Sequence, residues 1–146
     1  MITISIEENE NMESVFVDTG AWLSLYDKRD QNHQKAKEVA IYLKDEKVHL
    51  ITTDYVFDEA VTIIRMRVVH KDAINFGNSL LKSNVVKIVE IDDDFKKEAW
   101  NIFVKYKDHR FSYTDCTSFA VLSQMKIERV FGYDKHFESM QFTLLT

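Results

Sequence analysis

The sequence has no proline, only three glycines and a single cysteine, and each shortage narrows the possible architecture. The absence of proline excludes a Pro-rich linker, and neither a Gly/Ser-rich joint nor an internal repeat divides the chain. The 146 residues therefore predict one main domain at 15–146, preceded by an arm at 1–14. Cys116 has no second cysteine with which to form an internal disulfide, which fits a reducing cytosol.

Long apolar runs are also missing, since no stretch approaches the roughly 18 residues that a membrane-spanning helix needs. Residues 1–13 carry acids where a secretory signal peptide needs positive charge followed by an apolar core. We therefore expect a cytoplasmic protein with no membrane partner. Ile2, Ile4 and Ile6 alternate with polar residues, so the arm is expected to be a short edge strand or a loose extension.

An excess of positive charge is absent as well, because the formal net charge is −5. This excludes nucleic-acid binding through bulk positive field alone. It leaves room for an enzyme whose acids hold a divalent metal, because a bound cation inverts the local electrostatics. The composition, 45% hydrophobic and 29% charged, is that of a folded globular protein rather than a disordered one.

The chain does contain a regular alternation of short apolar runs and amphipathic segments. Short runs rich in Val, Ile and Phe predict buried strands, and apolar residues at i, i+3, i+4 and i+7 predict helices. The strands are expected at 15–18, 48–52, 85–91, 127–131 and 142–145, and the helices at about 22–25, 31–45, 56–64, 71–82, 95–106, 115–125 and 135–140. Such alternation predicts an α/β fold with a mainly parallel sheet.

Four carboxylates fall at junctions between these predicted elements. Asp18 ends the first strand, and Glu59 lies near the start of the helix after the second strand. Asp115 begins the helix before the late strand, and Asp134 closely follows that strand. In a right-handed parallel α/β fold such junctions lie on one edge of the sheet, so the four can converge. Converging carboxylates repel each other, a hard divalent cation relieves the repulsion, and the chemistry that follows is metal-assisted phosphodiester hydrolysis.

Each acid also has a structural alternative. Asp18 could cap a helix or start a turn, and Asp134 lies in a plausible turn. Asp115 occupies the fourth position of a capping-box pattern. Glu59 could be a solvated helix position, with its neighbour Asp58 facing the cleft instead. The shared placement at one kind of junction is what favours the functional interpretation.

With these acids at these positions, the chain resembles the PIN domain, especially the single-domain ribonucleases of VapBC-type toxin–antitoxin modules. The resemblance covers about 15–145, and it is carried by four motifs in order: Val17–Gly20, Thr53–Glu59, Phe111–Ala120 and Val130–Phe137. It implies a three-layer α/β/α sandwich with a central, mainly parallel sheet. It also implies an Mg²⁺- or Mn²⁺-dependent endoribonuclease that acts on RNA, serves as a toxin, has an antitoxin partner and forms a homodimer.

The resemblance assigns roles to the four acids. Asp18 and Asp115 would be the principal metal ligands, directly or through water. Glu59 and Asp134 would complete the metal site and orient the attacking water. All four are therefore expected to be both catalytic and metal-binding.

Substrate contacts are expected from fewer and weaker signals. Thr19 and Thr114 would donate hydrogen bonds to a ligand or phosphate, and Arg110 belongs to a basic group whose phosphate contacts would be salt-sensitive. Tyr113 could stack on an unpaired base or pack in the core. His136 could assist acid–base chemistry, although a single histidine in a helix is more often structural.

Two other functions compete with the nuclease. A PIN-like fold without activity would be an RNA-binding or assembly module, but a scaffold has no need of four mutually repelling acids. An acid-cluster phosphatase would usually carry a second Asp two residues after its nucleophile, where this chain has Gly20. The phosphate-binding P-loop pattern is absent as well.

Overall fold

The computed structural model describes residues 13–146. The predicted arm at 1–14, including the alternating Ile2, Ile4 and Ile6, therefore lies almost entirely outside the described residues. The strands are β1 (Ser14–Val17), β2 (His49–Thr53), β3 (Val86–Val89), β4 (Arg129–Phe131) and β5 (Thr143–Leu145). The helices are α2 (Thr19–Tyr26), α3 (His33–Asp45), α4 (Asp54–Arg67), α5 (His70–Lys82), α6 (Asp93–Lys105), α7 (Tyr113–Gln124) and α8 (His136–Ser139).

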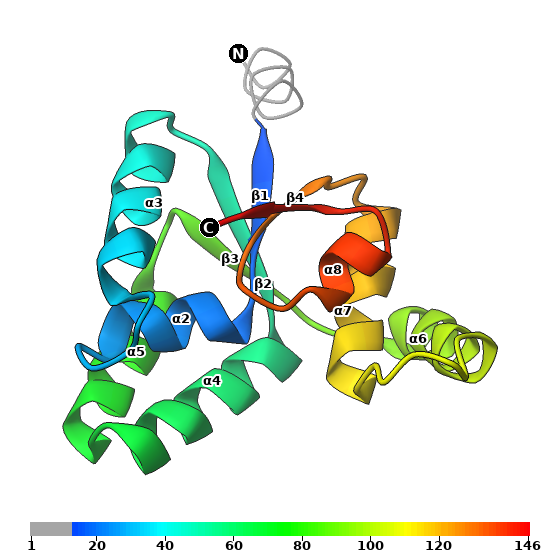
Figure 1. Cartoon of the computed structure of the whole chain (residues 1–146), viewed down its shortest axis with the longest axis horizontal. Helices are drawn as coiled ribbons and strands as arrows, with labels where there is room; N and C mark the ends of the chain where they lie inside the picture. The colour runs from blue at the N-terminus through cyan, green and yellow to red at the C-terminus, as the bar shows by residue number, and fades with distance from the viewer. Residues whose placement is uncertain (1–12) are drawn as a thin grey trace.

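The five strands form one sheet in the order β3-β2-β1-β4-β5, and every pairing is parallel. Figure 1 shows α2, α3, α4 and α5 on one side of the sheet and α6, α7 and α8 on the other. The predicted three-layer α/β/α sandwich with a central parallel sheet is confirmed. No helix in the described range is long and apolar enough to cross a membrane.

The strand order places a topological switch point at β1. From β1 the chain moves outward to β2 and β3, and it then returns to the other side of β1 with β4 and β5. In open α/β sheets, ligands bind outside the carboxyl ends of the strands at such a point, where the connections diverge to opposite sides. The carboxyl ends of β1 and β4 are therefore where a functional site is expected.

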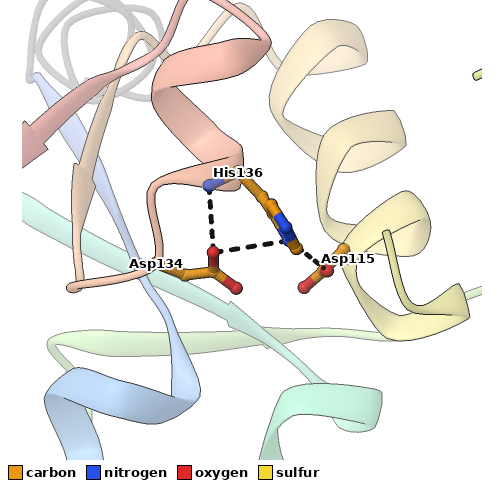
Figure 2. A group of neighbouring side chains, drawn as sticks. All are labelled: Asp115, Asp134 and His136. Atoms are coloured by element: carbon orange, nitrogen blue, oxygen red, sulfur yellow. Dashed lines mark hydrogen bonds and ion pairs between the residues drawn. The ribbon is translucent and has the colours of Figure 1, made fainter. Parts of the chain in front are cut away.

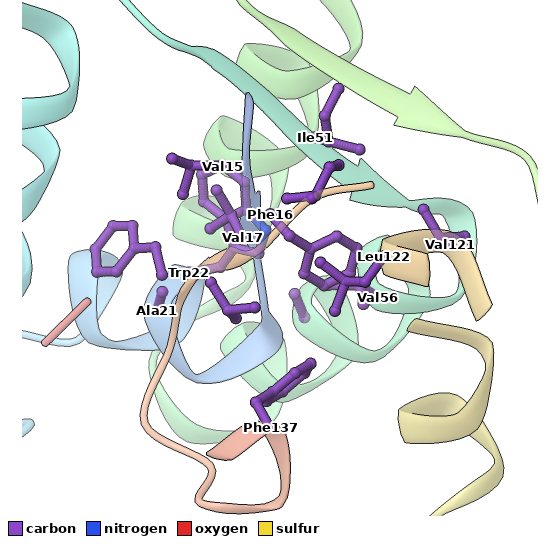
Figure 3. Close-up of a cluster of buried hydrophobic side chains, with 14 of the residues drawn as sticks. Val15, Phe16, Val17, Ala21, Trp22, Ile51, Val56, Val121, Leu122 and Phe137 are labelled. Carbon is purple, nitrogen blue, oxygen red and sulfur yellow. The ribbon is translucent and has the colours of Figure 1, made fainter. Parts of the chain in front are cut away.

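The central strand is buried on both faces, which explains its continuous apolar sequence. Val15, Phe16 and Val17 are fully buried. Figure 3 shows these side chains among Trp22, Ile51, Val56, Leu122 and Phe137, which come from both helical layers and the neighbouring strand. This packing fixes the position at which β1 ends.

Local capping explains where α4 begins. Thr53 is the N-cap residue of α4, and its Oγ1 accepts a hydrogen bond from the Val56 N–H at 3.0 Å. The Asp54 carboxylate instead accepts from the backbone N–H groups of Tyr55 and Ile91, and so ties α4 to the segment after β3. Two interactions, the Thr53 cap and the Asp54 hydrogen bonds, thus fix the start of α4 and with it the direction of Glu59.

Thr53→Ala is expected to destabilise the fold by about 1 kcal/mol, because it removes the oxygen that satisfies the Val56 N–H. Thermal unfolding should show a melting temperature lower by about 2–4 °C for a chain of this size. Thr62→Ala, at an exposed position in the middle of the same helix, is the matched control and should cost nothing. Equal losses in both variants would contradict the capping role.

Candidate metal centre at the carboxyl edge

Asp18 directly follows β1, and its side chain does not cap the helix that begins after it. The structure ends the strand at Val17, one residue earlier than expected, and Asp18 is the N-cap residue of α2. Its backbone C=O accepts the first helical hydrogen bonds, and its N–H donates to the Phe131 carbonyl at 3.0 Å, but its carboxylate makes no side-chain cap bond. The geometry therefore leaves the Asp18 carboxylate available, which the capping alternative would not.

The electrostatic surroundings of Asp18 are unusual. The pKa of its carboxyl is raised from 3.8 to about 7, chiefly by burial. A hydrogen bond from the backbone of Thr19 opposes the rise, and the charges of Asp115, Glu59 and Asp134 contribute to it. Only 8% of Asp18 is exposed. The pKa thus reports that all four predicted acids lie close enough to act on one group.

Gly132 allows this crowding at the end of β4. A Cβ atom at residue 132 would lie 3.2 Å from the Asp18 Cβ and 3.9 Å from its Oδ2. A side chain there would force the turn after β4 away from β1. The glycine therefore lets the segment that carries Asp134 approach the Asp18 carboxylate closely.

Asp115 caps its helix and also takes part in the acid cluster. Ser112 and Asp115 form a complete capping box, in which each side chain accepts from the other residue's N–H at 3.0 Å. The Asp115 Oδ2 atom also lies 3.1 Å from Nδ1 of His136. The two alternatives left by the sequence are therefore compatible, since one oxygen of Asp115 fixes the helix start while the residue still faces the other acids.

Asp134 follows β4 at the entrance to α8. Its Oδ1 accepts the backbone N–H of His136 at 2.9 Å and lies 3.4 Å from the His136 Nδ1. Figure 2 shows Asp134 and Asp115 on opposite sides of the His136 ring, so that segments from α7 and from the β4–α8 turn meet at one point. Asp115, Asp134 and His136 each offer a ligand atom within 4.8 Å of the others, which is a spacing suited to a metal ion.

Glu59 lies on the face of α4 that borders a cleft of about 480 Å³. The cleft is lined by Asp54, Tyr55, Asp58, Glu59, Thr62, Ile63 and Thr114. Both candidate acids of α4 reach it, but Glu59 is partly buried and acts on the charge of Asp18, whereas Asp58 is exposed. The structure therefore brings Glu59, rather than Asp58, to the acid cluster.

The three predicted substrate residues lie in different surroundings. Thr19 is buried, and its Oγ1 has no hydrogen-bond partner among the described residues. Thr114 lines the cleft beside Glu59. Arg110 is exposed in the loop before α7 and forms no ion pair with a described residue. Tyr113 packs edge-on against Tyr55 of the cleft wall, with ring centroids 6.3 Å apart.

The residues present fit a hard divalent cation. Carboxylate oxygens are the ligands that Mg²⁺ and Mn²⁺ prefer, and several of them converge here. The raised pKa of Asp18 means that the ionised cluster is destabilised without a compensating positive charge. The buried hydroxyl of Thr19 next to Asp18, which has no hydrogen-bond partner within residues 13–146, is a second indication that a polar ligand belongs at this edge.

His136 is the neighbour of the acids to which sequence reasoning gave too little weight. The sequence left open whether it assists acid–base chemistry or is structural, and in the structure it contacts two of the four acids. A local signal was available, because His136 lies two residues after Asp134, at the same carboxyl edge. The reach of its ring to Asp115, 21 positions away, has no counterpart in the sequence.

Fold and site together define the class as a three-layer α/β protein whose parallel sheet gathers carboxylates at its switch point. The chain belongs to the PIN-domain family, whose sequence profile matches residues 15–143. The resemblance predicted from the four motifs is therefore confirmed.

Curated relatives are similar over most of the chain. The 23S rRNA-specific endonuclease VapC20 of Mycobacterium tuberculosis is 28% identical over 128 residues, which cover 88% of this chain and 95% of that protein. The VapC ribonuclease of Archaeoglobus fulgidus is 25% identical over 85% of this chain and 79% of its own length.

Solved structures agree on the fold. The crystal structure of M. tuberculosis VapC20, described as a sarcin–ricin-loop-cleaving toxin, superposes with a TM-score of 0.80 and covers 88% of this chain and 96% of its own. VapBC2 from Rickettsia felis, crystallised with a promoter DNA fragment, gives a TM-score of 0.68 at 8% identity, covering 90% of this chain and 97% of its own. FitAcB from Neisseria gonorrhoeae gives 0.64 at 14% identity.

Proposed function

We propose that this protein is a metal-dependent endoribonuclease that hydrolyses RNA phosphodiester bonds and acts as the toxin of a toxin–antitoxin module. The observation that carries the proposal is the gathering of four acids at the carboxyl edge of the sheet. Asp115 and Asp134 lie on either side of His136, Glu59 borders the adjacent cleft, and the charges of all three act on the buried Asp18. Membership of the PIN-domain family supports it, as do the relatives named as an endonuclease and a ribonuclease. The cation would be Mg²⁺ or Mn²⁺, and the working unit would be the domain at 15–146.

Each acid has a role in this proposal that follows from its position. Asp18 and Asp115 would be the principal ligands of the cation, while Glu59 and Asp134 would complete the site and hold a water molecule in line with the scissile phosphate. A bound divalent cation would lower the pKa of that water and neutralise charge that develops on the phosphate. The Thr19 hydroxyl, which has no partner among the described residues, would donate a hydrogen bond to a phosphate oxygen.

The cleft beside Glu59 would receive the nucleotide next to the scissile bond. Its wall carries Tyr55, whose ring packs against that of Tyr113, and aromatic faces stack on unpaired bases without regard to sequence. Thr114, at the same cleft, would donate to the sugar–phosphate backbone. Arg110 would contact a more distant phosphate, and that contact would weaken as salt increases.

The partners of such a toxin would be an antitoxin protein and a second copy of the chain. The description of VapC20 as a toxin supports an antitoxin partner here. A homodimer is proposed from the family resemblance alone. Size-exclusion chromatography with light scattering distinguishes a mass of about one chain, 17.2 kDa, from twice that value.

The experiment that tests the proposed function is cleavage of a mixed pool of structured and single-stranded RNA in Mg²⁺, Mn²⁺ or EDTA. Wild type should cut only with metal, and Asp115→Asn should not cut. Asp94→Asn, an exposed acid in the first turn of α6, is the matched control and should cut like wild type. RNA binding without cleavage in any metal would instead favour the inactive RNA-binding module.

Divalent metal is expected to raise the melting temperature of wild type. Binding to the native state alone contributes about 2.7 kcal/mol when the metal is at 100 times its dissociation constant. For a chain of this size that corresponds to a shift of about 5–10 °C. Asp115→Asn should show a much smaller shift in a thermal melt. A wild-type melting temperature unchanged by millimolar Mg²⁺ and Mn²⁺ would contradict the metal site.

A further inference from the structure

His136 is held between two acids of the cluster by one ring nitrogen. Its Nδ1 lies 3.1 Å from Asp115 Oδ2 and 3.4 Å from Asp134 Oδ1, and its backbone N–H donates to that same Asp134 oxygen. Ionised carboxylates only accept hydrogen bonds, so Nδ1 must carry the proton and donate it. Figure 2 shows the ring filling the space between the two side chains.

The ring orientation is fixed from outside the acid cluster. Phe111 packs edge-on against the His136 ring, with centroids 5.1 Å apart and planes at 75°. Phe111 is buried and packs in turn against the fully buried Phe119. The next residue, Phe137, is also fully buried and anchors the short helix. The backbone and the plane of His136 are therefore set by the core, independently of any metal.

In both Asp115 and Asp134, the hydrogen bonds from described residues reach only one of the two carboxylate oxygens. Asp115 Oδ2 accepts from both the Ser112 N–H and His136 Nδ1, while Oδ1 receives no hydrogen bond from a described residue. Asp134 Oδ1 accepts the backbone N–H of His136 and lies 3.4 Å from its ring Nδ1, while Oδ2 likewise receives no hydrogen bond from a described residue. In both residues one oxygen is fixed to the scaffold and the other is left for a ligand.

We propose that His136 is a positioning residue, whose Nδ1–H holds Asp115 and Asp134 so that their remaining oxygens face one divalent cation. This inference rests on the proposed metal site, and it adds a residue that contacts the metal-binding carboxylates rather than the cation. Hydrogen-bond partners of metal-binding carboxylates and histidines set ligand orientation, and their loss typically costs about 10–100-fold in metal affinity or activity. Among the described residues, His136 is the one whose side chain forms ion pairs with both acids.

Three substitutions test which ring nitrogen matters. The amide nitrogen of His136→Asn lies close to the position of Nδ1, whereas that of His136→Gln lies close to the position of Nε2. We expect His136→Ala and His136→Gln to weaken Mn²⁺ binding by about 10–100-fold. His136→Asn should recover most of that loss. Calorimetric titration of the metal-free protein with Mn²⁺ measures the affinities without reference to activity.

His109→Ala is the matched control, because His109 also packs against Phe111, with centroids 4.8 Å apart, but forms no ion pair with a described acid. Its Mn²⁺ affinity should equal that of wild type. Unchanged affinity in His136→Ala, while wild type binds Mn²⁺, would overturn the positioning role alone. A better rescue by Gln than by Asn would overturn the assignment to Nδ1. A wild type that binds no Mn²⁺ would overturn the proposed function together with this inference.

The kinetic readout separates positioning from substrate binding. At saturating Mn²⁺, His136→Ala should have a KM for RNA close to that of wild type, and its loss should lie in kcat and in the metal concentration needed for half-maximal rate. Thermal melts in EDTA check that each variant folds. A rise in KM alone would assign His136 to the substrate and contradict the proposal.

Discussion

Asp18→Asn is expected to lower metal-dependent RNA cleavage by at least about 1,000-fold while the protein remains folded. Asp18 is the most buried of the four acids and lies at the end of the central strand, where the charges of the other three act on it. Asparagine keeps the size of the side chain and removes its charge. The substitution should remove several kcal/mol of metal-dependent stabilisation of the transition state. Each 1.36 kcal/mol changes the rate about tenfold, so a loss of about 4 kcal/mol corresponds to about 1,000-fold.

The measurement is a time course of RNA cleavage in Mn²⁺ by wild type, Asp18→Asn and Asp94→Asn. Asp94→Asn makes the same chemical change at an exposed acid of α6 and should retain full activity. Circular dichroism in EDTA verifies that both variants fold. Cleavage by folded Asp18→Asn at a rate near that of wild type would contradict the placement of the site at this edge of the sheet.

The fold could be predicted from the sequence because each of its clearest hydrophobic patterns results from one kind of burial. The apolar stretch at Val15–Val17 is uninterrupted because a central parallel strand is buried on both faces. The spacing of Val56, Ala60 and Ile64 marks the buried stripe of α4, and all three are buried in the structure. The predicted first strand, 15–18, lies one residue later than β1 at Ser14–Val17, because Asp18 looked like the last strand residue, whereas it is the N-cap of the following helix.

The site was only partly accessible, because neighbouring residues in a sequence point in different directions in a helix. Glu59 follows Val56 by three positions and so shares its side of α4, which brings Glu59 rather than the exposed Asp58 toward Asp18. The shared oxygen of Asp115 was not predictable, because it depends on the His136 ring arriving from a distant segment. Tertiary packing alone decides such contacts.

The stability of the metal-free protein should fall as pH rises from about 4 to about 7. The pKa of Asp18 is about 7 in the folded protein and 3.8 ordinarily, with burial as the largest cause. Between these values the native state holds a proton that the unfolded chain has lost, so raising the pH favours unfolding. A pKa difference of this size corresponds to a contribution on the order of 4 kcal/mol, fully developed above pH 7.

Asp18→Asn isolates this contribution from the other groups that titrate over the same range. Asparagine cannot ionise, so the free energy of unfolding of the variant should exceed that of wild type above pH 7, and the two should approach each other near pH 4. Urea unfolding at several pH values in EDTA measures the difference. A difference that does not change between pH 4 and pH 8 would contradict the raised pKa.

Metal should reverse the order of the two proteins, because a cation stabilises the ionised form of Asp18 that burial disfavours. In saturating Mn²⁺ at pH 8, wild type should gain free energy of unfolding through binding, while Asp18→Asn, which lacks a principal ligand, should gain little. The Asp18 carboxylate would then lower the free energy of unfolding of the metal-free protein and raise that of the metal-bound protein. A metal-induced gain of equal size in both proteins would place the cation elsewhere, and would separate the acid cluster from the proposed chemistry.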